Sequence, residues 1–150
     1  MKVYLSARYR RRLEMRGIRD ELEKRGCQVV SQWIDETYGS FKDVSSEYEK
    51  LLIAKQDKQD MQACDLFILF SDEGKTTHGM RFFEHGYVSA LGKAVWIVGK
   101  EENYFQWLEF DPPFKNIEQV YNYIDFLNEN HMDHWGQNHA EGAYSSGGQK

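Results

Sequence analysis

Short apolar runs alternate along the chain with longer segments of helical periodicity. Two of the runs, residues 65–70 and 94–99, are apolar almost throughout, which is typical of strands that helices cover on both faces of a parallel sheet. In the segments between the runs, apolar residues recur at intervals of three and four. The pattern predicts strands over 2–7, 27–34, 65–70 and 94–99, separated by helices over 11–26, 45–63 and 80–93.

The ends of the helical segments carry recognisable signals. The first helix ends near Gly26, which suits a C-terminal cap, and a last helix starts at Asn116 with Gln119 placed for a capping box. The expected buried stripes are Met15, Ile18 and Leu22 in the first helix and Ile117, Val120, Ile124 and Leu127 in the last. No periodicity remains after residue 130, so we expect one domain over 1–130 and a disordered tail over 131–150.

This order of elements predicts an α/β fold with three layers, a flavodoxin- or Rossmann-like open parallel sheet of about five strands with helices on both faces. Ligands of such sheets bind at the carboxyl ends of the strands, where the strand order reverses. The loops over 6–12, 71–79 and 99–105 are therefore expected to form the site.

Composition narrows the class of protein. The hydrophobic share is 41% with 15% aromatics, and 19 basic against 24 acidic residues give a net charge of −5. These values fit one soluble globular domain and argue against a general nucleic-acid binder. The sequence has no apolar run of membrane-spanning length and no signal peptide, so we expect a cytoplasmic protein without a membrane partner. Cys27 and Cys64 are expected to be buried free thiols.

The loop after the first strand is rich in arginine. Arg8 and the run 10–12 lie where a helix is expected to begin, and a helix N-terminus favours an anion. The loop could bind a phosphate. It has no glycine fingerprint, however, so a solvated surface set of ion pairs is the alternative.

Two acidic residues occupy unusual positions. Asp57 lies on the helical stripe that should face the sheet, whereas Lys55, Lys58, Asp60 and Asp65 can be assigned to surface or cap positions. An alternative is a helix rotated so that Asp57 is exposed to solvent.

Glu84 is the other unusual acid. It falls in the aromatic segment just inside the helix after the third strand, where a carboxylate is a candidate nucleophile or base. Gly86 leaves room beside it for backbone or ligand. An exposed ion pair with Arg81 is the alternative.

Three stretches also resemble a known family: YLSAR at 4–8, Asp57 ahead of CDLFILF, and RFFEHGYVSALGKAVWIVG at 81–99. Over residues 2–100 the chain resembles the nucleoside 2-deoxyribosyltransferase family, including its relatives that hydrolyse the N-glycosidic bond of deoxynucleoside 5′-monophosphates. The resemblance implies that Glu84 is the nucleophile and that Asp57 engages the substrate or its leaving base. It also implies that Tyr4 holds the Glu84 carboxylate.

The chemistry of these residue types agrees with the resemblance. Glycosidic cleavage with retention needs a carboxylate that attacks the anomeric carbon and a second acid that protonates the leaving base. One residue departs from the family pattern: members acting on free nucleosides have an acid where this chain has His78. A phosphate-bearing substrate is therefore favoured. The expected substrate-binding residues are Ser6, Arg8, His78, Gly79, Arg81 and Gly86.

The sequence thus predicts an enzyme that cleaves or exchanges the N-glycosidic bond of a nucleoside or its 5′-monophosphate. The alternative is a nucleotide-binding sensor or regulatory module without turnover. We expect no cofactor and no metal, because the tail histidines His131, His134 and His139 fit no strong zinc spacing. A homodimer or larger homo-oligomer is expected from the resemblance and from the apolar stretch NYFQWLEF at 103–110.

Overall fold

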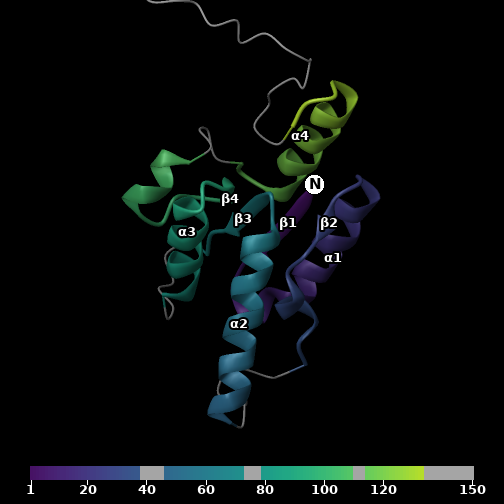
Figure 1. Cartoon of the computed structure of the whole chain (residues 1–150). Helices are drawn as coiled ribbons and strands as arrows, with labels where there is room; N and C mark the ends of the chain where they lie inside the picture. Colours follow the sequence, from purple (N-terminus) through teal and green to yellow (C-terminus); the bar gives the residue numbers. More distant parts are fainter. Residues whose placement is uncertain (38–45, 73–78, 110–113, 134–150) are drawn as a thin grey trace, which may run out of the picture.

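The computed structural model describes residues 1–37, 46–72, 79–109 and 114–133. Within them a parallel sheet of four strands has the order β2-β1-β3-β4 (Figure 1). The strands are β1 Lys2–Ser6, β2 Gln28–Val29, β3 Leu66–Phe70 and β4 Ala94–Val98. The helices are α1 Arg12–Lys24, α2 Glu47–Ala63, α3 Met80–Ala90 and α4 Ile117–Glu129, with short 3-10 turns η1 Tyr9–Arg11, η2 Gln32–Asp35 and η4 Tyr104–Leu108.

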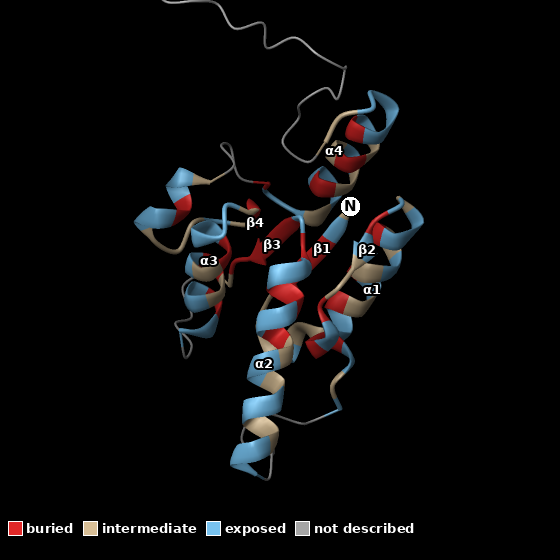
Figure 2. Cartoon of the chain, viewed as in Figure 1, coloured by how far each residue is buried: buried red, intermediate tan, exposed pale blue. Residues whose placement is uncertain are grey.

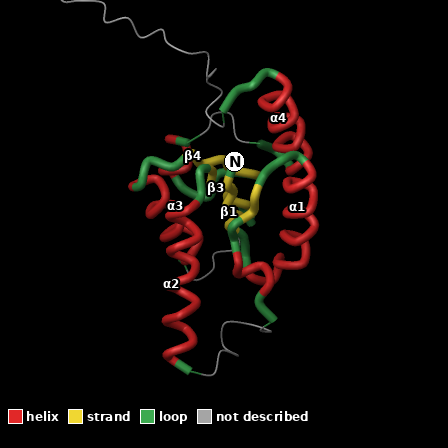
Figure 3. Tube along the Cα trace, turned by 45° about the vertical axis from the view of Figure 1, so that its right-hand side comes forward, coloured by secondary structure: helices red, strands yellow, loops and turns green. Residues whose placement is uncertain are grey.

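The sheet lies between two layers of helices, which confirms the predicted fold class. Helices α1 and α4 pack together on one face, and α2 packs beside α3 on the other (Figures 1 and 3). Every residue of β3 and β4 is buried (Figure 2), as their unbroken apolar sequence predicts for central strands. The helices therefore protect both faces, and the carboxyl ends of the strands form one edge.

The predicted strand over 27–34 is much shorter in the structure, and side chains explain why. Only Gln28 and Val29 pair with β1. Beyond them the Ser31 hydroxyl accepts a hydrogen bond from the Leu5 backbone N–H at 2.6 Å, and the Trp33 indole N–H donates to the Leu5 carbonyl at 2.8 Å. These side-chain bonds satisfy the edge of β1, so the chain can leave the sheet and form η2.

Among the described residues the sheet has four strands, where about five were expected. Where a fifth strand would lie beside β4, the described chain makes a single parallel bridge between Val98 and Phe114 before α4 begins. Asn116 caps α4 as predicted, since its side chain accepts from the Gln119 backbone N–H. Of the expected stripe in α4, Ile117 is only half-buried, while Val120, Ile124 and Leu127 are buried.

The expectation that Asp60 lies at the surface or in a cap was wrong. Asp60 is 5% exposed. Its carboxylate accepts hydrogen bonds from the backbone and side chain of Gln32 at 3.0 and 3.1 Å and from the Gln56 side chain at 2.9 Å. These bonds attach α2 to η2, a tertiary contact that a helical pattern does not reveal.

Two smaller expectations can be compared with the structure. Cys27 and Cys64 are both buried and free, as predicted. No helix among the described residues is long and apolar enough to cross a membrane. The predicted tail lies outside the described residues from 134 onward.

Candidate active site

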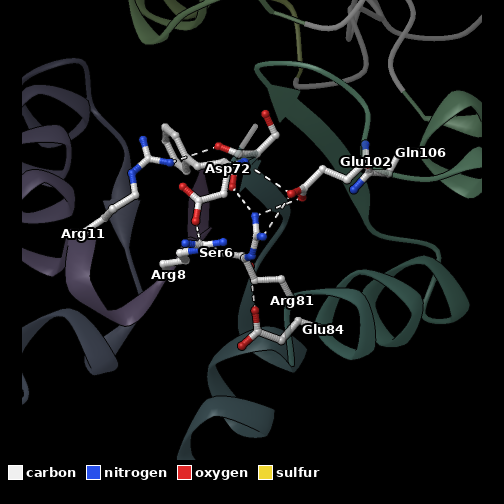
Figure 4. Close-up of polar contacts among 10 residues, drawn as sticks. Ser6, Arg8, Arg11, Asp72, Arg81, Glu84, Glu102 and Gln106 are labelled. Carbon is white, nitrogen blue, oxygen red and sulfur yellow. Dashed lines mark hydrogen bonds and ion pairs between the residues drawn. The ribbon is translucent and has the colours of Figure 1, made fainter. Parts of the chain in front are cut away.

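Three predicted residues, Tyr4, Asp57 and Glu84, come together on the α2/α3 face of the sheet. Residues two apart on a strand point to the same face, so Tyr4 and Ser6 of β1 both face this layer. The Ser6 hydroxyl donates to a Glu84 carboxylate oxygen at 2.6 Å (Figure 4). Asp57 approaches from α2, and its charge acts on the Tyr4 hydroxyl together with that of Glu84.

Tyr4 is held rigidly in the core. It is fully buried, and its ring stacks on Phe67 of β3 with centroids 5.5 Å apart. Among the described residues its hydroxyl has no partner with full hydrogen-bond geometry, yet it lies near enough to Glu84 to stabilise the carboxylate. Burial, followed by the charges of Glu84 and Asp57, raises the pKa of Tyr4 well above its usual value. The phenol therefore stays protonated and can donate to a carboxylate or a ligand.

The two carboxyl groups both titrate near neutral pH. Burial raises the pKa of Asp57 to about 7, with smaller contributions from the charges of Glu84, Glu36 and Asp60. Burial also raises the pKa of Glu84 to about 7, against the opposing effects of Ser6, Arg81 and Tyr4. Near pH 7 the pair can therefore share one proton, which leaves one group as an acid and the other as a nucleophile.

Arg81 does not form the exposed ion pair with Glu84 that was the alternative expectation. Its side chain is buried, 7% exposed, and it binds elsewhere. The guanidinium donates to the Phe70 carbonyl at 2.8 Å and to both carboxylate oxygens of Glu102 at 3.0 and 3.1 Å (Figure 4). A fixed cation thus lies one helical turn before Glu84.

The remaining expected substrate-binding residues differ in their contacts and their exposure to solvent. Arg8 follows β1 and forms an ion pair with Asp72 (Figure 4). Gly79 is the N-cap of α3 with a φ of +71°, a left-handed conformation that favours glycine. Gly86 is exposed, and a side chain there would meet no neighbour within 4 Å. His78 lies outside the described residues.

A cavity of about 790 Å³ opens at the carboxyl ends of β3 and β4, on the α1/α4 side. Its lining includes Arg8, Arg10, Arg11 and Lys115, so the arginine loop does face a cavity at the predicted edge. Arg11 is engaged by Glu14 and by the Ser71 carbonyl. The carboxylates Asp57 and Glu84 do not line this cavity.

Sequence reasoning missed Glu102. Its role depends on Arg81, which is 21 residues away in the chain, so no local spacing marks the pair. The available signal was weaker: Glu102 lies in the loop after the fourth predicted strand, one of the three loops expected at the site.

The chain matches the family described as nucleoside 2-deoxyribosyltransferase over residues 3–139. It is similar in structure to the 2-deoxyribosyltransferase of the psychrotolerant bacterium Bacillus psychrosaccharolyticus, with a TM-score of 0.66 and 17% identity over 82% of this chain and 92% of that one. It is also similar to the CMP N-glycosidase BcmB of Clostridium botulinum, with a TM-score of 0.54 and 19% identity over 83% of this chain and 99% of that one. Curated protein sequences give no match.

At these identities the structural similarity shows the fold alone. The family match is of another kind, because it spans most of the chain, from β1 past the end of α4. The chain belongs to the nucleoside 2-deoxyribosyltransferase family.

Proposed function

We propose that the protein cleaves or exchanges the N-glycosidic bond of a deoxynucleoside or nucleoside, or of its 5′-monophosphate, through a covalent glycosyl intermediate on Glu84. The observation that carries the proposal is the pair of carboxyl groups, Asp57 and Glu84, each with a pKa near 7 and both beside Tyr4. Family membership supports the reaction class.

In the first step the ionised Glu84 carboxylate attacks the anomeric carbon, and the bond from that carbon to the base breaks. Protonated Asp57 gives its proton to the leaving base, so the base departs neutral. Ser6 holds one carboxylate oxygen of Glu84 by its 2.6 Å hydrogen bond, and Tyr4 stabilises the carboxylate from β1.

In the second step Asp57, now ionised, takes a proton from the incoming nucleophile. If water attacks the glycosyl ester, the product is the free sugar, or its 5-phosphate from a monophosphate substrate, and the reaction is hydrolysis. If a second base attacks through nitrogen, the reaction is transfer. Glu84 is released as a carboxylate and Asp57 regains its proton, so both groups return to their starting states.

We favour a phosphate-bearing substrate. In this proposal Arg8, His78 and Arg81 remain the predicted phosphate ligands, but Arg8 and Arg81 already have acidic partners with which a phosphate would compete. The nearby cavity offers two further cations, Arg10 and Lys115, both exposed and without an acidic partner among the described residues. They give a phosphate a second place to bind at the same edge of the sheet.

Base release from a panel of deoxynucleosides and their 5′-monophosphates, with and without a second free base, tests the proposal. We expect release with the unmodified protein, none with Glu84→Gln, and a covalent sugar adduct on Glu84 detectable by mass spectrometry after rapid quenching. Full activity of Glu84→Gln would refute the nucleophile.

A nucleotide sensor without turnover is the second candidate. The observation in its favour is the cavity that Arg10 and Lys115 line, together with the acidic residues Glu14, Asp72 and Glu118. Asp57 and Glu84 do not line it, so its cations could hold an anion without any chemistry. A sensor would bind the monophosphate and release no base from any member of the panel.

We also propose that the protein acts as a homodimer or larger homo-oligomer in the cytoplasm. The turn η4 exposes large apolar side chains to solvent: Tyr104, Phe105, Trp107 and Leu108 are 63 to 92% exposed. A contiguous apolar surface of this kind is typical of a contact with another chain.

A further inference from the structure

Residues 102–109, which we call the strap, connect both ends of η4 to α3. At one end Glu102 binds Arg81. At the other end Glu109 accepts from Ser89 at 2.8 Å and lies 2.6 Å from the ring nitrogen Nε2 of His85. Residues 81, 85 and 89 follow one another at four-residue intervals, so the strap contacts a single face of α3.

The contact at Glu102 is more rigid than a surface ion pair. The side chains of Arg81 and Glu102 are only 8% and 11% exposed, and they meet through two N–H···O bonds. Glu102 is held in turn, because its backbone N–H donates to Gln106 at 2.5 Å and its carboxylate accepts from the Asp72 backbone at 3.3 Å. Figure 4 shows this network beside Glu84. The guanidinium therefore has one well-defined position.

That position matters for Glu84. Arg81 precedes Glu84 by three residues, and its charge favours the ionised carboxylate against the effect of burial. The other groups that face Glu84 are Tyr4 and Ser6 from β1 and Asp57 from α2, none of which is a cation. Arg8 is repelled by Arg81 and is not among the groups that shift the pKa of Glu84. Among the described residues, Arg81 is thus the cation that acts on Glu84.

We propose that Glu102 is a positioning residue for the reaction: its two-point ion pair holds the Arg81 guanidinium one helical turn from Glu84 and so sets how readily the Glu84 carboxylate ionises. The inference rests on the proposed function for its meaning in catalysis. The effect that it predicts on the ionisation of Glu84 can be measured whether or not the protein is catalytically active.

The two members of the ion pair should shift Glu84 in opposite directions. Arg81→Met removes the cation and leaves the Glu102 carboxylate unbalanced, so the pKa of Glu84 should rise above about 7. Glu102→Gln removes the balancing charge and one of the two acceptor oxygens, while the Phe70 carbonyl still holds the guanidinium. Arg81 should therefore act more strongly, and the pKa of Glu84 should fall. Each change should be about one pH unit, as expected for one buried charge.

The matched control is Glu109→Gln. Glu109 binds the same strap to the same helix face, but it contacts His85 and Ser89 and not Arg81. If the strap has a purely structural role, Glu102→Gln and Glu109→Gln should have similar effects. If Glu102 positions Arg81, Glu109→Gln should leave both the ionisation of Glu84 and the rate of base release unchanged.

The measurement is a pH titration of ¹³C-carboxyl glutamate signals by NMR, with Glu84 assigned from the signal that Glu84→Gln lacks. Opposite shifts in Arg81→Met and Glu102→Gln, with none in Glu109→Gln, are expected. With a nucleoside that lacks the phosphate as substrate, the acid limb of base release should move by the same amounts, with a change in kcat rather than in KM. Shifts in the same direction, no shifts, or an equal shift in Glu109→Gln would overturn the proposal.

Thermal melts show which variants fold. If Arg81→Met does not fold, Arg81→Lys replaces it in the comparison with Glu102→Gln. The lysine keeps the charge without the two-point geometry, so the pKa of Glu84 should rise by less than in Arg81→Met. The pKa of Glu84 in Glu102→Gln should still fall. A protein that releases no base refutes the proposed function, and the NMR titration still decides whether Glu102 sets the ionisation of Glu84.

Discussion

Asp57→Asn should make the protein more stable at alkaline pH and slower as an enzyme. Asp57 is 9% exposed, and its carboxylate has no hydrogen-bond partner among the described residues. Its pKa rises from 3.8 to about 7, first because of burial. An asparagine at this position carries no charge into the interior, so the substitution removes an electrostatic penalty.

The sign follows from proton linkage. The folded state binds the Asp57 proton more tightly than the unfolded state does, so the stability present below the unfolded pKa is lost as pH rises through the folded pKa. Between about pH 4 and pH 7 the stability of the unmodified protein should therefore fall on account of this residue. A shift from 3.8 to about 7 corresponds to about 4 kcal/mol, which is the upper bound for the gain in Asp57→Asn above pH 7.

Urea unfolding at pH 4 and at pH 8 measures this difference. We expect nearly equal stabilities of the two proteins at pH 4 and a clear advantage of Asp57→Asn at pH 8. Glu23→Gln on the exposed side of α1 is the control, because Glu23 is exposed and the substitution should change stability equally at both pH values. A gain in Asp57→Asn that is the same at pH 4 and pH 8, or absent at both, would refute the assignment of a buried, proton-binding Asp57.

Four further outcomes are expected. Base release by Asp57→Asn should be slower by about 10²-fold, the usual contribution of a general acid; an unchanged rate would remove Asp57 from the mechanism. The rate of the unmodified protein should follow a bell-shaped pH profile centred near pH 7, since Glu84 must be ionised and Asp57 protonated, each with a pKa of about 7; a plateau from pH 5 to 9 would contradict this. Arg10→Ala should raise KM several-fold for a monophosphate and leave the matching nucleoside unaffected, and equal effects on both would exclude a phosphate at Arg10. Sedimentation should show a dimer or larger assembly that Trp107→Glu weakens, whereas an active monomer would exclude the proposed interface.

Much of the fold follows from the order of residues along the chain. The runs 65–70 and 94–99 could be placed in a central parallel sheet because their unbroken apolar sequence suits strands covered on both sides, and both are buried throughout. The stripe that placed Asp57 toward the sheet also held, since this residue and Met61 are buried in α2. The spacing of apolar residues is a local property of the sequence. It predicts which residues are buried wherever a helix or strand packs along its whole length.

Where side chains replace backbone pairing, the local pattern misleads. The run 27–34 has the composition of a full strand, but Ser31 and Trp33 bond to the backbone of Leu5 and end the pairing with β1 after two residues. Nothing in the run itself reveals this, because the partner lies more than 20 residues away. Asp60 was misplaced for the same reason: the contacts that bury it come largely from η2.

The same distinction between local sequence and tertiary contacts applies to the candidate site. The sequence by itself indicated Asp57 and Glu84 through their unusual positions and Tyr4 through the family resemblance. Only the tertiary structure brought β1, α2 and α3 together around one pair of carboxyl groups. It also decided the partners of the arginines, by joining Arg8 to Asp72 and Arg81 to Glu102. An isolated charge has several possible partners in a chain, and the choice depends on distance and burial, which are set when the elements pack.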